Sequence, residues 1–305
     1  YINVPFGILS LLGVIALAKE STLEKERPFD LFGFMLLSIA IVSLQLMLDR
    51  GQSKYWFESG EILFELIIAM LALYLFTVHL FTHKNAYIDP RVFRDRNFNL
   101  GLLFMFLLGV IMLATMALFP PYLQTLLGYP VLDAGLILAP RGGGTMLAML
   151  LCSAVMERSL VSPRYVIVTG LVLIVFSMWK MTGFNINVTH AMITWTGIVQ
   201  GFGLGLIFVP LSTLAFATLD AELRTEATSI FGLARTIGSS LGISIVMGQL
   251  ANNLQREHAL LTEHVSTFNP LLHNTAFTPI WDIHTPQGLA LLETEVSRQA
   301  LQLAY

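Results

Sequence analysis

The sequence has 305 residues, of which 55% are hydrophobic and only 12% charged, with a net charge of −3 at pH 7. Soluble domains carry about 25% charged residues, so this composition excludes an ordinary soluble protein and predicts an all-α polytopic membrane protein. No basic tract suggests nucleic acid as a partner, and a single cysteine, Cys152, excludes a disulfide framework or thiolate metal site within one copy.

The apolar segments set the number of membrane crossings. A crossing needs about 20 apolar residues, and eight segments meet this requirement: 1–18, 31–48, 61–82, 98–119, 134–156, 165–182, 190–219 and 226–250. The segments after the first, third, fifth and seventh spans hold ten Lys and Arg residues, and the alternate segments hold five. Because positive charge favours the cytoplasm, we predict that residues 83–97 are cytoplasmic and that both sequence ends and residues 250–298 are periplasmic.

Charged residues flank the second and third spans. Asp30 stands where it can cap the second span. Glu61 and Glu65 lie one turn apart at the outer edge of the third span, and we interpret them as a solvated interfacial face, with a proton relay as the alternative. The connector 83–97 carries Arg91, Arg94 and Arg96, and Arg224 follows the seventh span. These four arginines predict either an anchor on anionic lipid or a cytoplasmic gate that latches two halves of a transporter.

The outer end of the fourth span is partly aromatic and partly polar. Tyr122, Gln124 and Tyr129 follow its last apolar residues. Interfacial tyrosines commonly form a membrane belt, but Tyr122 and Gln124 also stand where a substrate would leave the bilayer. Methionines occur at several positions in the fourth and fifth spans, and Met146 is one of them. Methionine adapts to irregular shapes, so these residues are either ordinary packing or part of a promiscuous substrate pathway.

The fifth span contains several adjacent residues that are energetically unfavourable in a membrane helix whose only role is to anchor the protein. Pro140 is followed by Arg141 and then by Gly142, Gly143 and Gly144. Proline removes a helix hydrogen bond, each glycine costs about 1 kcal/mol relative to alanine, and an intramembrane arginine costs about 2.5–3.5 kcal/mol. Irregular backbone at membrane depth is tolerated where it lines a cavity. We therefore predict that the Arg141 guanidinium faces a central cavity and that its neighbours act in helix packing or as a hinge.

The seventh and eighth spans carry small residues one turn apart. These are Gly197, Gly201 and Gly205, followed by Pro210, in the seventh span, and Gly238 and Gly242 in the eighth. Such spacing predicts either static close helix packing or a bending helix. Gln200 lies near the middle of the seventh span and is expected to face the same interior as Arg141. Arg235 lies about 15 Å into the eighth span, which favours a buried partner or cavity over snorkelling.

The chain becomes polar after Gln249. Two helical pieces, 251–264 and 287–305, bracket a proline-containing middle, and a long structured loop of this kind predicts a docking partner. The histidines in this region lack metal-binding spacing, and no catalytic or nucleotide motif occurs, so we predict no enzyme, metal or cofactor. The sequence begins at Tyr1 inside an apolar run and ends at Tyr305 inside an apparent helix, so we expect a piece of a longer protein.

Four motifs, in this order and spacing, carry a family resemblance: YINVPFG at 1–7, IDPRVFRDRNF at 88–98, PPYLQTLLGY with AGLILAPRGGGTM at 120–146, and RTEATSIFGLARTIGSSLGISI at 224–245. The sequence resembles the 14-helix drug:proton antiporters of the major facilitator superfamily, the EmrB/QacA type. The resemblance implies the C-terminal part of that fold, from about the sixth to the thirteenth helix. It divides the chain into the sixth helix and two linker helices (1–82), a cytoplasmic connector (83–97), five bundle helices (98–250), and a periplasmic loop with the start of the last helix (251–305).

The resemblance also implies a function. It predicts proton-coupled efflux of small amphipathic compounds across a Gram-negative inner membrane, with a periplasmic adaptor and an outer-membrane channel as partners and the lipid bilayer as environment. The coupling acid is expected upstream of Tyr1. A dedicated metabolite or siderophore exporter of the same fold is one alternative. A non-transporting membrane scaffold or channel subunit is another, although intramembrane Arg141 and Arg235 argue against it.

Overall fold

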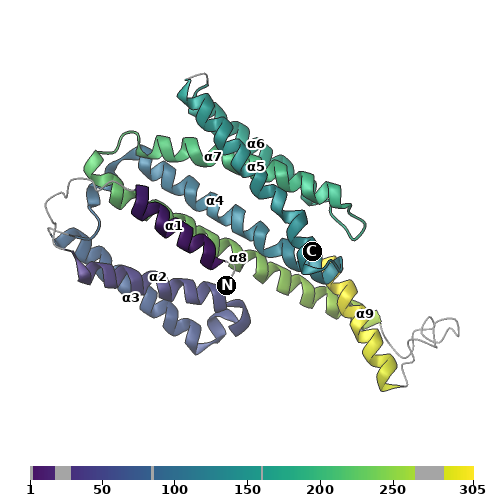
Figure 1. The fold of residues 1–305 in the computed structure, drawn as a ribbon. Coiled ribbons are helices and arrows are strands. Elements are labelled where there is room, and N and C mark those ends of the chain that lie inside the picture. The colour runs from purple at the N-terminus through teal and green to yellow at the C-terminus, as the bar shows by residue number, and fades with distance from the viewer. Residues whose placement is uncertain (1–2, 18–28, 84–85, 159–160, 265–284) are drawn as a thin grey trace.

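The computed structural model describes residues 3–17, 29–83, 86–158, 161–264 and 285–305, and the described residues form helices and no strands (Figure 1). The α-helices are α1 (Asn3–Leu17), α2 (Leu31–Arg50), α3 (Gly60–Thr82), α4 (Arg96–Pro121), α5 (Val131–Glu157), α6 (Pro163–Met181), α7 (His190–Phe216), α8 (Arg224–His264) and α9 (Pro286–Ala304). Among the described residues, seven helices, α2 to α8, are long and apolar enough to cross a membrane. The predicted all-α membrane fold is confirmed. The described part of the first predicted span, α1, has 15 residues, fewer than the about 20 that a crossing needs.

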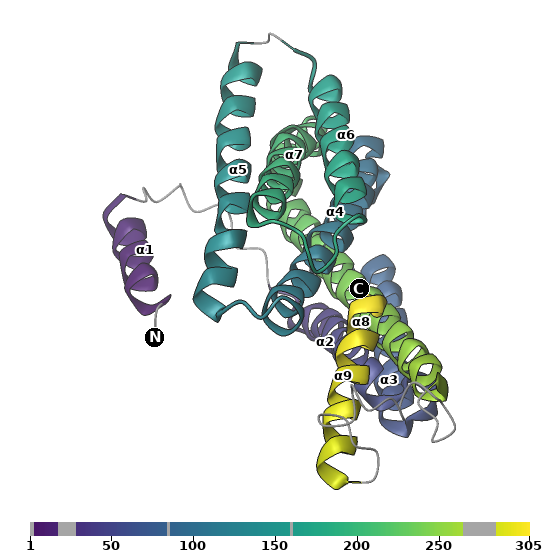
Figure 2. The same cartoon turned by 90° about the vertical axis from the view of Figure 1, so that its right-hand side faces the viewer.

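The helices pack in pairs along their lengths. α5 lies along α7, α6 lies against the other side of α7, α4 lies along α8, and α2 and α3 form a hairpin beside α8. α1 stands apart from these pairs (Figure 2). The largest cluster of buried apolar side chains joins α4, α6, α7 and α8 to the connector before α4, through residues such as Val92, Phe98, Ile207 and Ala227. This cluster holds the connector end of the bundle together.

Asp30 caps α2, as the sequence predicts, and also fastens the hairpin. Its carboxylate accepts hydrogen bonds from the Gly33 N–H at 2.9 Å and the Tyr87 N–H at 2.9 Å, and lies 2.8 Å from His79 Nε2. Burial tends to raise the pKa of Asp30, but these hydrogen bonds lower it below its ordinary value. One side chain thus joins α2, α3 and the connector.

Two helices continue beyond the ends of the predicted spans. α4 continues from Phe119 through Pro120 and Pro121 and passes into a π-helical turn, Tyr122–Leu126. The two prolines remove only their own N–H groups, and membrane helices tolerate proline where the freed carbonyls find other partners. α8 continues unbroken from residue 250 to His264, so the predicted helical piece 251–264 is part of the same helix as the eighth predicted span.

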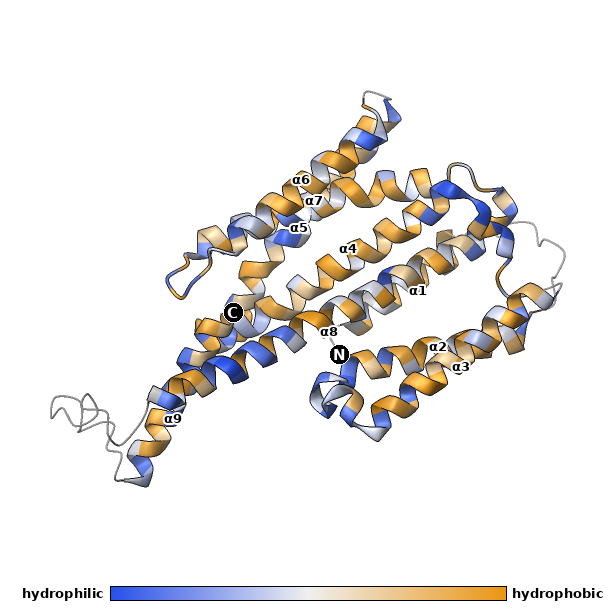
Figure 3. Cartoon of the chain, turned by 180° about the vertical axis from the view of Figure 1, so that it is seen from behind, coloured by the Kyte–Doolittle hydropathy of each residue, from blue (hydrophilic) through white to orange (hydrophobic). Residues whose placement is uncertain are grey.

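Polar residues collect at the helix ends. Figure 3 shows apolar residues along α2 to α7, and polar residues at the helix ends and along the part of α8 that leads to α9. α9 packs against α8 in this polar region. The predicted helical piece 287–305 therefore exists as α9, whereas the predicted middle of the loop, 265–284, lies outside the described residues.

The topology can be tested with exposed sites at the two ends of α8. Arg94 in the connector and Glu293 on α9 are both exposed, and the connector and α9 lie toward opposite ends of α8 (Figure 1). We expect a membrane-impermeant maleimide to label Glu293→Cys in intact cells, and to label Arg94→Cys only after the inner membrane is permeabilised, because positive charge favours the cytoplasm. Cys152→Ser provides the cysteine-free background. The reverse labelling pattern would contradict the orientation.

Candidate functional site: two cavities beside α4

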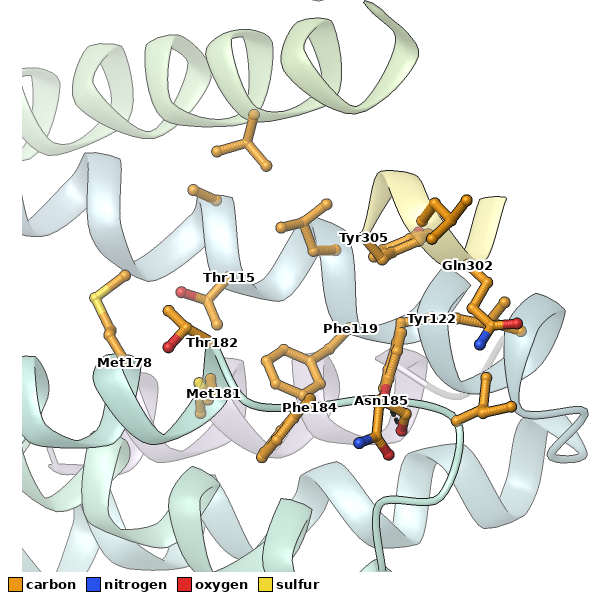
Figure 4. Close-up of a pocket in the computed structure, with 16 residues that line it drawn as sticks. Thr115, Phe119, Tyr122, Met178, Met181, Thr182, Phe184, Asn185, Gln302 and Tyr305 are labelled. Carbon is orange, nitrogen blue, oxygen red and sulfur yellow. Dashed lines mark hydrogen bonds between the residues drawn. The ribbon is translucent and has the colours of Figure 1, made fainter. Parts of the chain in front are cut away.

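An outer cavity of about 490 Å³ lies between the end of α4, the end of α6, the turn before α7, and α9 (Figure 4). Its lining is mostly apolar and aromatic, with Thr115, Thr182, Asn185 and Gln302 as polar exceptions. Buried Tyr122 donates its hydroxyl hydrogen to the Asn185 carbonyl at 3.0 Å. Its ring centroid lies 5.5 Å from that of Tyr305. An apolar space of this size with a few polar groups suits an amphipathic molecule.

An inner cavity, also about 490 Å³, lies on another side of α4 and is bounded by α5, α7 and α8. Arg141 from α5 and Arg235 from α8 both line it. The Arg141 guanidinium donates from Nη2 to the Met112 carbonyl on α4 at 3.3 Å. Four methionines share the lining: Met105, Met112, Met116 and Met149. Hereafter this space is called the arginine cavity.

Other residues predicted for the pathway lie elsewhere. Gln200 does not line the arginine cavity: it is fully buried, and its Nε2 donates to Thr115 Oγ1 on α4 at 3.2 Å. Its Oε1 has no hydrogen-bond partner among the described residues. Met146 is 60% exposed and lines neither cavity, and Gln124 also lies outside both linings. The direction of each side chain around the helix matters here, since Met149, three residues after Met146 and about 60° away around the helix axis, does line the arginine cavity.

The helix pairs approach each other at the predicted glycines. A Cβ at Gly201 would collide with the Arg141 carbonyl, and one at Gly205 would lie 2.5 Å from the Thr145 carbonyl. On α8, a Cβ at Gly238 would collide with the Phe106 carbonyl of α4, and one at Gly242 with the Val110 carbonyl. These four positions are therefore contacts of backbone against backbone, in which the glycine hydrogen is the only group that fits.

The glycines of the fifth span divide into two groups. A Cβ at Gly144 would lie 2.7 Å from the Ile198 carbonyl of α7, whereas Cβ atoms at Gly142 and Gly143 would meet nothing within 4 Å. On α7, a Cβ at Gly197 would lie 3.7 Å from its nearest neighbour, which is an ordinary van der Waals distance.

α5 remains continuous through Pro140, and α7 remains continuous through buried Pro210. The irregular backbone that the sequence predicts at residue 140 is therefore absent from this conformation. A hinge at either proline stays a prediction.

The four predicted gate arginines are exposed at the connector end. Arg91 donates from Nε and Nη2 to the Asp89 carboxylate at 2.9 and 2.7 Å, and this pairing, with Glu222 and Asp220 nearby, raises the pKa of Arg91. The Asp89 N–H in turn donates to the Glu226 carboxylate of α8 at 2.7 Å. The connector is thus fastened to the start of α8 through Asp89, while the gate role of all four arginines remains a prediction.

Glu65 is not part of a solvated face. It is 8% exposed, and its Oε1 accepts from Arg50 Nη1 at 3.2 Å, while Arg50 and Lys54 also pair with Glu61. The short turn between α2 and α3 folds Arg50 back over the first turn of α3 and covers Glu65. The sequence interpretation treated Glu61 and Glu65 alike, whereas the α2–α3 hairpin buries Glu65 and leaves Glu61 exposed.

Comparison with known proteins identifies the family. The sequence profile described as Major Facilitator Superfamily matches residues 1–243. The chain belongs to the major facilitator superfamily. Among its relatives, the multidrug export protein EmrB of Escherichia coli strain K12 is 32% identical over 274 residues, covering 88% of this chain and 53% of EmrB. The fatty acid resistance protein FarB of Neisseria gonorrhoeae is 29% identical over 279 residues, covering 90% of this chain and 54% of FarB. The chain thus spans about half the length of these curated relatives.

Membership of this superfamily assigns the chain to a family of multi-pass membrane transporters rather than enzymes. The sequence analysis had already selected Tyr122, which lines the outer cavity, and Arg141 and Arg235, which line the arginine cavity. It missed Asn185, Gln302 and Tyr305, which line the outer cavity with Tyr122 (Figure 4). Asn185 lies in a short polar turn and Gln302 in an amphipathic helix, and neither pattern carries a signal for a substrate pathway.

Proposed function

We propose that this superfamily member is the C-terminal part of an inner-membrane exporter of small amphipathic compounds, driven by proton influx through alternating access. The carrying observation is that two apolar cavities are separated by one turn of α4. Met112 and Met116 face the arginine cavity, and Ala114 and Thr115 face the outer cavity. A modest shift of α4 relative to its neighbours would join the two spaces, which is what passage of a substrate through this half requires.

The similarity to a multidrug export protein and to a fatty acid resistance protein supports export of amphipathic compounds. The resemblance to drug:proton antiporters supports proton coupling. The alternative of a dedicated metabolite exporter predicts a narrow, polar site, whereas both cavities here have mainly apolar linings. The scaffold alternative leaves the intramembrane charges of Arg141 and Arg235 without a role.

Transport by the complete protein tests this proposal. Inside-out vesicles should accumulate ethidium or a fluorescent fatty acid when a proton gradient is imposed, and should lose the accumulated probe when an uncoupler dissipates the gradient. Vesicles without the protein are the control. Absence of gradient-driven transport across a panel of cationic, neutral and anionic amphipathic probes would contradict the exporter proposal.

We also propose that the periplasmic arm, defined as residues 251–305 and so comprising the end of α8, residues 265–284 and α9, contacts a periplasmic adaptor of a tripartite system that continues to an outer-membrane channel. The polar surface of this arm and the packing of α9 on α8 support the proposal (Figure 3). Thr285, whose hydroxyl caps α9 by accepting from the Gly288 N–H at 3.2 Å, gives α9 a defined beginning.

Replacing residues 265–284 with a short Gly-Ser linker should separate transport from resistance. The linker keeps both helices of the arm and the Thr285 cap, and shortening a loop changes its closure free energy by only about 0.6 kcal/mol per halving of length. We expect gradient-driven transport in vesicles to persist and drug resistance of whole cells to be lost, because the compound must also cross the outer membrane. Full resistance in cells that carry the linker variant would contradict a docking role for this segment.

A further inference from the structure

A third cavity, of about 560 Å³, lies between the α2–α3 hairpin on one side and α4 and α8 on the other. Ile88 and Phe93 of the connector line it at the end where α4 begins. Each lining residue is Ala, Ile, Leu, Met or Phe. Hereafter this space is called the hairpin groove. Besides the two connector residues, its lining falls within residues 37–44 of α2, 69–76 of α3, 102–106 of α4 and 230–237 of α8.

The composition of this lining points to a hydrocarbon chain as the ligand. Binding sites for small molecules combine an apolar wall with a few polar groups that fix the orientation of the ligand. The outer cavity and the arginine cavity both have such groups, whereas the lining of the hairpin groove has none. A ligand of the groove must therefore keep its polar part outside, as the tail and the headgroup of a membrane lipid are divided.

The hairpin groove is open along one side. Met70 and Leu73 of α3, Phe93 of the connector and Leu103 of α4 all line it, and each is at least 40% exposed. These residues come from both walls of the groove, so the opening lies between the hairpin and α4. An acyl chain can therefore enter sideways from the bilayer, and the helices do not have to separate.

The depth of the groove matches one leaflet of a bilayer. Its α4 wall reaches Phe106, ten residues after Arg96, the first residue of α4, which is about 15 Å at 1.5 Å per residue. The hydrocarbon core of a bilayer is about 30 Å thick, so the groove extends from the connector to about the midplane. Nearer the outer end the hairpin and α8 touch directly, where Ser244 Oγ donates to the Leu48 carbonyl at 2.9 Å.

A positive charge stands at the connector end of the groove. Arg96 is exposed and takes part in no ion pair with any residue in the described ranges. The neighbouring acid, Asp95, caps α4, since its carboxylate accepts from the Phe98 N–H at 2.8 Å. Leu103 follows Arg96 by seven residues, close to two helical turns, so both lie on nearly the same face of α4. Arginines beside the membrane surface attract the headgroups of anionic phospholipids.

We propose that the hairpin groove binds an anionic phospholipid, with one acyl chain between the α2–α3 hairpin and α4 and the phosphate beside Arg96. The lipid is a packing component and not cargo, because it fills the space between helices that touch directly only nearer their ends. The groove shares no lining residue with the outer cavity or the arginine cavity. The proposal therefore does not rest on the export function.

Photo-crosslinking of the complete protein locates the lipid. The protein carries p-benzoylphenylalanine in place of Phe106, which lies deep in the groove, and is reconstituted in vesicles that contain equal amounts of phosphatidylglycerol and phosphatidylethanolamine. We expect irradiation to attach a phospholipid through its acyl chain, and mass spectrometry of the labelled peptide identifies it. Attachment of another part of the protein would show that the chain itself fills the groove, and would overturn the proposal.

A matched pair of positions measures the headgroup preference. Leu103 lines the groove and Leu151 on α5 lines none of the three cavities, yet both are 54% exposed. Each also lies seven residues from an exposed arginine on the predicted cytoplasmic side, Arg96 and Arg158 respectively. With the photo-crosslinker at one position or the other, we expect the ratio of attached phosphatidylglycerol to phosphatidylethanolamine to be at least about fivefold higher at 103, because a lipid held by its tail keeps its phosphate hydrogen-bonded to the guanidinium.

Equal ratios at the two positions would show that a surface arginine attracts lipid without any help from the groove, and would overturn the site. Arg96→Gln should lower the ratio at position 103 by about fivefold, whereas Arg158→Gln should leave it unchanged. Ala234→Phe adds a ring to the α8 wall of the groove, so it should largely abolish lipid attachment at position 106 while attachment at position 151 persists. A ratio at position 103 that does not respond to Arg96→Gln would contradict the anionic headgroup.

Discussion

Gly201→Ala is expected to destabilise the protein and abolish transport, whereas Gly143→Ala is expected to do neither. A Cβ at position 201 would collide with the Arg141 carbonyl and would lie 2.9 Å from Thr145 Oγ1, so α5 and α7 must move apart along their shared length. Overpacking of this kind costs about 1–3 kcal/mol, which exceeds the gain of about 1 kcal/mol that alanine brings to a helix.

Gly143 is the matched control for this prediction. It lies on α5 beside the same contact, but it is exposed and a Cβ there would meet nothing within 4 Å. The substitution therefore adds only the helix preference of alanine, and the unfolding midpoint should stay the same or rise. Scanning fluorimetry of the purified proteins measures both midpoints, and vesicle transport measures activity. Similar midpoints for the two variants would mean that α5 and α7 do not pack as closely as described here.

Arg141→Ala is expected to reduce transport by at least about tenfold without reducing membrane insertion. The substitution removes an intramembrane charge, which makes insertion easier, and it removes the hydrogen bond from α5 to the Met112 carbonyl of α4. The cavity then loses the positive charge of Arg141 and the hydrogen bond that joins α5 to α4. Arg141→Lys should recover only part of the activity, because lysine lacks the planar set of donors.

The initial rate of gradient-driven uptake into inside-out vesicles, normalised to the amount of inserted protein, measures this effect. Arg164→Gln serves as the control, since Arg164 is an exposed arginine at the start of α6 that lines neither cavity. An Arg141→Ala protein that inserts normally and transports at the rate of the unaltered protein would show that the guanidinium has no part in transport.

Hydrophobic length predicts most of this fold. The second, third, fourth and sixth predicted spans begin and end within two residues of α2, α3, α4 and α6. The helical structure continues past two of the predicted spans for one reason: a hydrophobic run ends where the bilayer ends, but a helix does not have to. α4 continues past Pro121 as a π-turn, and α8 continues past residue 250 along polar residues that pack against α9.

The site was predicted less completely, because composition gives the depth of a residue but not the direction of its side chain. Arg141 and Arg235 were selected by the cost of their charge, and the structure brings both to one cavity. Gln200 was expected beside them and instead turns toward Thr115. Gly143 and Gly144 are adjacent and identical in sequence terms, yet only Gly144 touches α7. The rotation of each helix about its own axis decides which of its residues face a cavity or a neighbouring helix. This rotation depends on packing against helices that are distant in the sequence.

The unbroken length of α8 has a mechanical consequence. At 1.5 Å per residue its 41 residues extend about 60 Å, roughly twice the thickness of the hydrocarbon core of a bilayer. One rigid rod therefore carries Arg235 inside the membrane and supports α9 outside it. When the inner part of such a rod tilts, its outer end swings in proportion to its distance from the pivot. We therefore expect a rearrangement around the cavity to be transmitted, and enlarged, at the surface on which α9 lies.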